Sequence, residues 1–273
     1  MSLTIRIRQQ TSIPVEVDSL RMDVVREQSA DEVKATLIQY GNKQLPLGEF
    51  FDVQGSAGDE HLVWEGDCSH VKLIGSELAS GEIRVEGNAG MHLGAEMTGG
   101  EITVTGDVAD WAGAEMHGGL IQIHGNAGHL PGAVYRGGFK GMTGGEILIH
   151  GHAGNEIGHG MRRGLIAVGG RSGDAPGVNM IAGSIFLFGN SGIRPGAGMK
   201  RGSIVFFGRE AAPAMLPTFR SGGRCEPVFL RTYLQHLKSR GFPVPEGVLE
   251  AGYDRYNGDF LETGKGEILI RAT

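Results

Sequence analysis

Long apolar runs are missing from this sequence of 273 residues, and so is any excess of positive charge. No apolar stretch approaches the roughly 18 residues that would indicate a transmembrane helix. A formal net charge of −6 argues against bulk binding to nucleic acid. The first residues, Met1-Ser-Leu-Thr-Ile-Arg, do not have the pattern of a signal peptide. We therefore expect a cytoplasmic protein that binds neither membranes nor nucleic acid.

Cysteine is also scarce, with only Cys68 and Cys225 in the whole chain. The two residues are far apart and do not form a CxxC motif, so a zinc site or a redox pair built from them is not expected. Two free thiols in a reducing compartment are the expectation. The apolar content of 40% is still enough for a chain of this length to bury a core.

Glycine, by contrast, is abundant, and it marks a repeat. Seven phrases of the form Gly-x-Ile-x-Val-x-Gly follow one another at intervals of 19 residues, apart from one interval of 26 that indicates a seven-residue insertion. They begin at Gly81, Gly100, Gly119, Gly145, Gly164, Gly183 and Gly202. A fixed period near 20 residues is typical of a stack of equivalent structural units.

Each phrase alternates apolar and other residues, as a half-buried strand does. One inward column is formed by Ile83, Ile102, Ile121, Ile147, Ile166, Ile185 and Ile204. The second half of each unit carries a methionine at a fixed place, at Met97, Met116, Met161, Met180 and Met199, which we expect to fill the core where the chain turns back. The predicted fold is all-β: a right-handed parallel β-helix, a single-stranded solenoid of about seven 19-residue coils.

Together with the segments on either side of the repeat, the sequence predicts that the chain has three parts. Residues 1–60 are expected to form a small α+β capping domain, 61–208 the β-helix, and 209–273 a C-terminal extension with a helix at about 228–240 and a final strand. In the first part, Ser29 and Glu32 form a capping box that opens a helix predicted to reach about Gln39, with Gly41 suited to end it.

The outward face of the late coils is apolar, whereas the early coils carry charged and polar residues there. The apolar positions are Phe186, Phe188, Val205 and Phe207. A wall of this kind needs a cover. The C-terminal helix and a partner subunit are the two candidates, and in the second case these four residues would lie at a partner interface.

Catalytic chemistry finds no support in the sequence. No nucleophile–base pair stands out, and His124 and His150, which share an outward position in neighbouring coils, have no recurring acidic or thiol residue beside them to complete a metal site. We expect no catalytic residue, no metal site and no cofactor bound by this chain alone.

Basic residues gather at turns instead. The pairs Arg162-Arg163 and Lys200-Arg201 are equivalent positions two coils apart, and Arg136 and Lys140 lie in the insertion. Together they are a candidate electropositive edge for an acidic partner or for the polyanionic tail of a cofactor. The alternative interpretation is that they are ordinary solvated charges on turns.

The repeat Gly-x-Ile-x-Val-x-Gly-[Asn/Asp]-x-Gly-x-x-x-Gly-x-x-Met-x-x-Gly resembles the GXGXG domain at the end of glutamate synthase large subunits. The resemblance to the C subunit of formylmethanofuran dehydrogenase, and to its bacterial counterpart in the formyltransferase/hydrolase complex of methylotrophs, is closer. It rests on the segment from Leu45 to Gly55 (Leu-Pro-Leu-Gly-Glu-Phe-Phe-Asp-Val-Gln-Gly), on Gly87-Asn-Ala-Gly90 and on the length, and it covers nearly the whole chain.

The resemblance implies a non-catalytic structural subunit of an enzyme complex that handles formyl groups on a methanofuran-type cofactor, in tetrahydromethanopterin-linked one-carbon metabolism (formaldehyde oxidation). The partners it implies are the A, B and D subunits, with the metal in the A subunit. An archaeal-type formylmethanofuran dehydrogenase and a stand-alone glutamate-synthase-like β-helix domain remain the alternatives.

Overall fold

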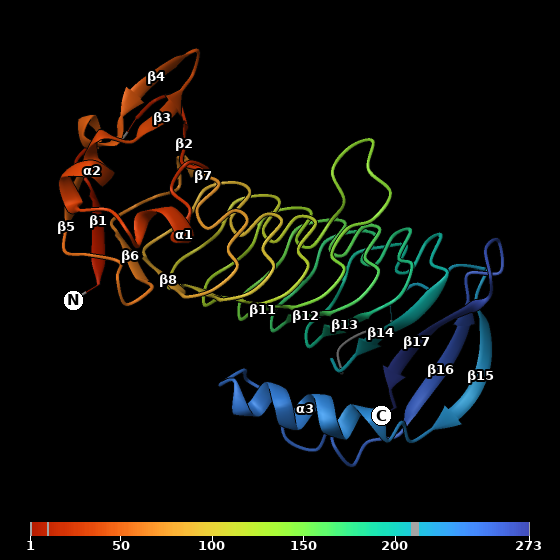
Figure 1. Ribbon diagram of the computed structural model, residues 1–273. Coiled ribbons are helices and arrows are strands. Elements are labelled where there is room, and N and C mark those ends of the chain that lie inside the picture. Colours follow the sequence, from red (N-terminus) through yellow and green to blue (C-terminus); the bar gives the residue numbers. More distant parts are fainter. Residues whose placement is uncertain (1, 10, 209–212, 273) are drawn as a thin grey trace.

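A computed structural model describes residues 2–9, 11–208 and 213–272 (Figure 1). The chain is mostly β, with one large sheet of 13 strands, a small sheet of four strands and few helices. No helix of the described residues is both long and apolar enough to cross a membrane. Both cysteines are free thiols, as expected, and Cys68 is buried.

Strand order in the large sheet follows the chain over most of its width. From one edge to the other the strands are β15 (Arg220–Cys225), β16 (Tyr253–Gly258), β17 (Lys265–Arg271), β14 (Arg201–Phe206), β13 (Ser184–Leu187), β12 (Leu165–Val168), β11 (Glu146–Ile149), β10 (Leu120–Ile123), β9 (Glu101–Val104), β8 (Glu82–Glu86), β6 (His61–Glu65), β1 (Leu3–Ile7) and β5 (Phe51–Gln54). The small sheet contains β4 (Lys43–Pro46), β3 (Leu37–Tyr40), β2 (Val15–Glu16) and β7 (Val71–Lys72). The helices are α1 (Met22–Val25), α2 (Ala30–Ala35), the 3₁₀ helix η1 (Leu47–Glu49) and α3 (Phe229–Ser239).

The repeat strands pair in parallel and in register, so each residue lies beside its equivalent 19 residues away, or 26 across the insertion. Ile102 is paired with Ile83 on one side and with Ile121 on the other. The same register continues to Ile204, which pairs with Ile268 in β17. All seven isoleucines of the predicted inward column are at most 1% exposed, which confirms the predicted facing of the strands.

Polar side chains tie successive turns of the chain together. The backbone N–H of Asp107 donates to Oδ1 of Asn88 at 2.9 Å, and the N–H of Asn126 donates to Oδ1 of Asp107 at 2.6 Å. The N–H of His152 then donates to Oδ1 of Asn126 at 2.8 Å. Each side chain satisfies a backbone donor that the turn leaves without a sheet partner, so the ladder stabilises the stacking of the turns.

The predicted methionine column is also buried, since all five side chains are fully inaccessible to solvent, and Met142 joins it as a further member. Met142 was not predicted, although it lies 19 residues before Met161 and 26 after Met116, as the insertion requires. Part of the insertion forms an exposed loop at 136–140, which projects from the stack of turns before β11 (Figure 1).

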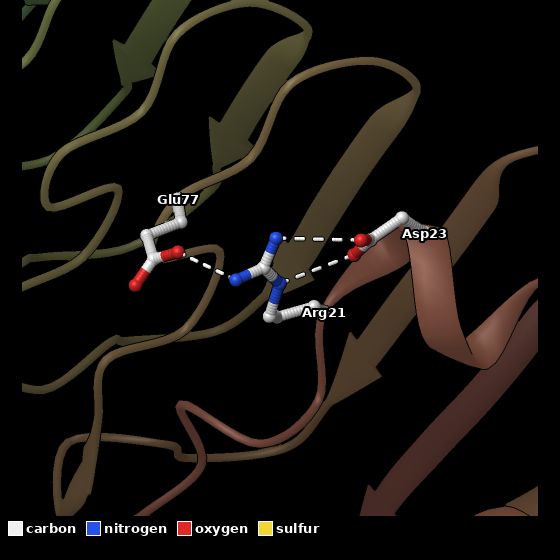
Figure 2. Close-up of polar contacts among 3 residues, drawn as sticks. All are labelled: Arg21, Asp23 and Glu77. Carbon is white, nitrogen blue, oxygen red and sulfur yellow. Dashed lines mark hydrogen bonds and ion pairs between the residues drawn. The ribbon is translucent and has the colours of Figure 1, made fainter.

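Two of the N-terminal strands, β1 and β5, continue the large sheet, whereas β2, β3 and β4 belong to the small one. Strand β1 pairs in parallel with β6 and antiparallel with β5. Arg21, just before α1, lies between Asp23 and Glu77 and donates to both carboxylates, at 3.2 Å to Oδ1 of Asp23 and 2.6 Å to Oε2 of Glu77 (Figure 2). These contacts attach the α1 segment to the first turns of the stack. The hydrogen bond from Arg21 lowers the pKa of Asp23.

The capping box at Ser29 and Glu32 is confirmed, but the predicted length of its helix is wrong. The helix α2 ends at Ala35, and β3 begins at Leu37, inside the range predicted to be helical. Pairing with β4 and β2 decides the conformation there, because both partners offer backbone hydrogen bonds to this segment. Gly41 ends no helix and instead lies in the turn between β3 and β4, with φ of +60°.

The apolar wall predicted on the late strands is covered by α3. Phe186, Phe188, Val205 and Phe207 are at most 9% exposed and pack in one cluster with Leu230, Leu234 and Leu237 of the helix. Phe188 stacks on Phe207, with ring centroids 4.5 Å apart. Of the two predicted covers, the C-terminal helix is the one observed. A role of these residues at a partner interface stays a prediction, and such a partner would contact them through α3.

Candidate functional site

A groove of about 920 Å³ runs along the edge of the large sheet where strands β11 to β14 begin. Its floor is formed by the turns that precede these strands, and Tyr233 of α3 and Thr263, just before β17, complete the lining. The lining extends over five strands, β11 to β14 and then β17, and four spacings of about 4.8 Å between them give the groove a length of about 19 Å. We call it the basic groove.

Five of the six predicted basic residues line this groove: Lys140, Arg162, Arg163, Lys200 and Arg201. The sixth, Arg136, is exposed on the insertion loop and is not part of the lining. The structure therefore brings together residues that are 61 positions apart in the sequence, from 140 to 201. Among the described residues of the lining, Glu146 is the single carboxylate, and it is hydrogen-bonded to His236.

The position of these charges follows from the repeat. Met161 and Met199 are fully buried, and in each case the next two residues are exposed basic ones. Since the turns stack in register, Arg162 and Lys200 occupy equivalent places two turns apart, which corresponds to about 10 Å. The intermediate turn carries Ile181 and Ala182 at the same place, so an apolar step separates the two basic pairs.

Most of the cationic groups in the groove lack an internal counter-charge. Lys200 has a long contact with Glu262, at 3.9 Å, and both side chains are largely exposed. Within the described part of the chain, no carboxylate forms an ion pair with Lys140, Arg162, Arg163 or Arg201. The groove consequently presents a concentrated positive field on a chain whose net charge is −6.

The same sheet edge is acidic further along. A second groove of about 670 Å³ crosses the beginnings of β6 to β11, and its lining includes the carboxylates of Asp59, Glu60, Glu82, Glu101 and Glu146. We call it the acidic groove. The two grooves meet at Gly145 and Glu146, which line both. The sign of the charge therefore reverses at β11.

Comparison with known proteins places this chain in a family. No family model matches the chain. A chain in the crystal structure of the formyltransferase/hydrolase complex (FhcABCD) from Methylorubrum extorquens, in complex with methylofuran, superimposes with a TM-score of 0.91 and is 34% identical. The alignment covers 99% of this chain and 100% of that one. This chain belongs to the same family as that subunit of the complex.

Curated relatives whose names specify a subunit are C subunits. The C subunit of the tungsten-containing formylmethanofuran dehydrogenase 2 of Methanothermobacter marburgensis is 43% identical over 90 residues, which is 32% of this chain and 33% of the relative. The C subunit of the molybdenum-containing formylmethanofuran dehydrogenase 1 of Methanosarcina barkeri is 41% identical over 85 residues, or 30% of this chain and 28% of that one. These alignments span about a third or less of each curated relative. The family is therefore that of the C subunits.

The histidines of this C-subunit homologue form contacts of a structural kind. The rings of His124 and His150 are 4.6 Å apart, and Phe242 packs on His150 at 5.1 Å. Burial, followed by the proximity of His124, lowers the pKa of His150, so this ring is neutral at pH 7. No group of three or more His, Cys, Asp or Glu side chains in the described residues is arranged to hold a metal ion.

An aromatic cluster on the outer surface was not predicted from the sequence. Trp111 stacks against both His92 and Tyr135, with centroid distances of 6.1 and 5.2 Å, and the rings of His92 and Tyr135 are themselves 5.6 Å apart. Nδ1 of His92 is hydrogen-bonded to the hydroxyl of Tyr135 at 3.1 Å, and burial raises the pKa of Tyr135 to about 12. The 19-residue spacing of His92 and Trp111 was a usable signal for their adjacency. Tyr135 gave none, because it lies at the start of the insertion.

Proposed function

We propose that this chain is a non-catalytic structural subunit of a formyltransferase/hydrolase complex. That complex transfers and hydrolyses formyl groups on a methanofuran-type cofactor, in tetrahydromethanopterin-linked one-carbon metabolism in the cytoplasm. The observation that carries the proposal is the match over the whole chain, at 34% identity, to a chain of a complex of this name that holds methylofuran. In this proposal the other subunits carry out the reaction, and the metal is bound by the A subunit.

The fold we propose for residues 61–208 is a right-handed parallel β-helix, flanked by a capping domain at 1–60 and an extension at 209–273. The in-register parallel pairing at each 19-residue step and the fully buried methionine column support it. Such a stack is rigid and extended, and it presents equivalent turns in rows. These are the properties expected of a subunit that holds others in position.

The C subunit of an archaeal-type formylmethanofuran dehydrogenase is the second candidate. The observation in its favour is the higher identity, 43% over 90 residues, to the corresponding subunit of the tungsten-containing enzyme. The two candidates agree that this chain acts as part of a hetero-oligomer. They differ in whether a molybdenum or tungsten subunit is present.

Affinity purification of the tagged, full-length chain from its native organism, followed by mass spectrometry, tests the proposal. We expect the A, B and D subunits of a formyltransferase/hydrolase complex to co-purify, together with formyl transfer activity. A molybdenum- or tungsten-binding partner would instead favour the second candidate. Recovery of the chain alone, or with a glutamate synthase, would contradict both.

A further inference from the structure

We propose that the basic groove docks an extended, acidic segment of a partner protein chain. The inference rests on the proposed function only for the origin of that segment, a neighbouring subunit of the complex. The kind of ligand is inferred from the groove itself, namely from its charges, its length and its apolar border.

The charges select an anionic ligand. Five cationic side chains converge on one groove, and four of them have no ion-pair partner among the described residues. Arg162, Arg163 and Arg201 carry guanidinium groups, which bind carboxylates through two parallel hydrogen bonds. Because the net charge is −6, the protein as a whole repels an acidic ligand, whereas the basic groove attracts one.

The length and the border of the groove favour a peptide over a small anion. A distance of about 19 Å accommodates about six residues of extended chain, at about 3.3 Å per residue. Ile181 and Tyr233 add apolar surface between the cations. In the loops that supply Lys140 and Thr263, the large apolar side chains Phe139 and Leu261 are 90% and 81% exposed. Exposed apolar groups beside a polar groove are typical of protein–protein contact sites.

The acidic groove limits where such a segment can lie. It begins at Glu146, and the carboxylates of Glu101 and Glu82 follow on the next strands of the same edge. An acidic chain that extended beyond β11 would place like charges next to each other. The reversal of charge at β11 therefore determines where the bound segment ends, while the basic groove favours a segment of negative charge.

The first experiment measures binding of a fluorescent hexaglutamate peptide to the purified full-length chain by anisotropy at low salt. We expect binding that weakens as salt is added, because exposed charge pairs are screened. The double variant Arg162→Glu/Arg163→Glu should lose at least about tenfold in affinity, a factor that corresponds to about 1.4 kcal/mol.

The matched control is the double variant Arg171→Glu/Arg194→Glu. It changes the net charge by the same amount, and its two residues are exposed on turns that follow β12 and β13, outside the basic groove. This control should bind the peptide as the unaltered chain does. Equal losses in the two double variants, or no binding by the unaltered chain, would overturn the proposal, provided that thermal unfolding shows all proteins folded.

The second experiment repeats the native co-purification with both double variants. We expect the groove variant to lose at least one partner subunit and the control to keep all of them. If the groove variant keeps every partner, the groove binds something other than a partner segment, such as the anionic tail of a small molecule, and the proposal is wrong. If the unaltered chain itself recovers no formyl-handling subunit, the proposed function fails, whereas the peptide measurement still decides the groove's preference for an acidic chain.

Discussion

His236 in α3 and Glu146 in β11 join the C-terminal helix to the middle of the large sheet. Nε2 of the imidazole lies 2.7 Å from Oε1 and 2.9 Å from Oε2 of the carboxylate. Both side chains are partly exposed, at 38% and 26%. The contact spans 90 residues of sequence, and it fixes the helix beside the point where the two grooves meet.

The contribution of this pair to stability should be small, because both partners are partly exposed and water competes for their hydrogen bonds. A double-mutant cycle with His236→Ala and Glu146→Ala should give a coupling energy of about 0.2–1 kcal/mol. Denaturant midpoints at pH 7 provide the measurement. A coupling energy well above that range would mean that the pair, rather than apolar packing, holds α3 in place.

Apolar packing under α3 should contribute far more. Phe186 is fully buried between the sheet and the helix, with its ring 5.4 Å from that of Tyr233. Phe186→Ala should cost about 3–5 kcal/mol through lost burial and the cavity left behind. Gln235→Ala, on the exposed side of α3, is the control and should change stability by about 0.5 kcal/mol or less. Similar unfolding midpoints for the two variants would show that α3 does not cover the wall.

The turns of the stack approach one another so closely that some glycines cannot carry a side chain. A Cβ at Gly99 would clash with the backbone carbonyl oxygen of Ala79 in the preceding turn. We expect Gly99→Ala to destabilise the protein by about 1–3 kcal/mol, because the backbone has to move. Gly58, in an exposed loop, has only ordinary contacts at its Cβ position, so Gly58→Ala should be within about 0.5 kcal/mol of the unaltered protein. Chemical denaturation distinguishes the two, and a harmless Gly99→Ala would refute the close stacking.

Stability should decline at alkaline pH. Burial, helped by the charge of Asp67, raises the pKa of the Cys68 thiol to about 12, and burial raises the pKa of Tyr253 to about 12. In the unfolded chain these groups lose their protons near pH 8.5 and 10. Between those values and pH 12 the unfolded state has released protons that the folded state retains, so the free energy of unfolding falls as pH rises.

The measurement is the urea midpoint as a function of pH from 7 to 11. Cys68→Ala should make the decline above about pH 8.5 shallower, although it also lowers stability at pH 7 by removing a buried side chain. Burial also raises the pKa of Cys225, but this thiol is less buried, so Cys225→Ala should change the slope less than Cys68→Ala does. An identical slope in the unaltered protein and in Cys68→Ala would exclude the thiol as a cause.

Much of the fold was predictable because the same pattern of residues recurs in each unit of the repeat. A single Ile at position 102 says little, but the same residue type at 83, 121 and 147 sets the strand facing and its partners. The basic groove was predictable to the same extent, since equivalent positions in stacked turns must be neighbours. Lys140 could be placed only loosely, because the insertion interrupts the register there.

The rest depended on contacts between segments that share no repeat. The strand character of Leu37–Tyr40 comes from pairing with β4 and β2, and it overrides the helical tendency that starts at Ser29. The packing of α3 over the apolar wall likewise depends on contacts between segments that are distant in the sequence. The acidic groove was not predicted, although Glu82, Glu101 and Glu146 occupy the same position of the repeat; only its end at His61 lies outside the regular repeat.

The central claim, that this chain is a structural subunit without its own active site, is tested most directly by a formyl transfer assay. Purified chain and purified complex are supplied with formylmethanofuran, and hydrolysis and transfer of the formyl group are followed in each. We predict turnover by the complex and none by the chain alone. Turnover by the isolated chain at a rate comparable to that of the complex would contradict the account.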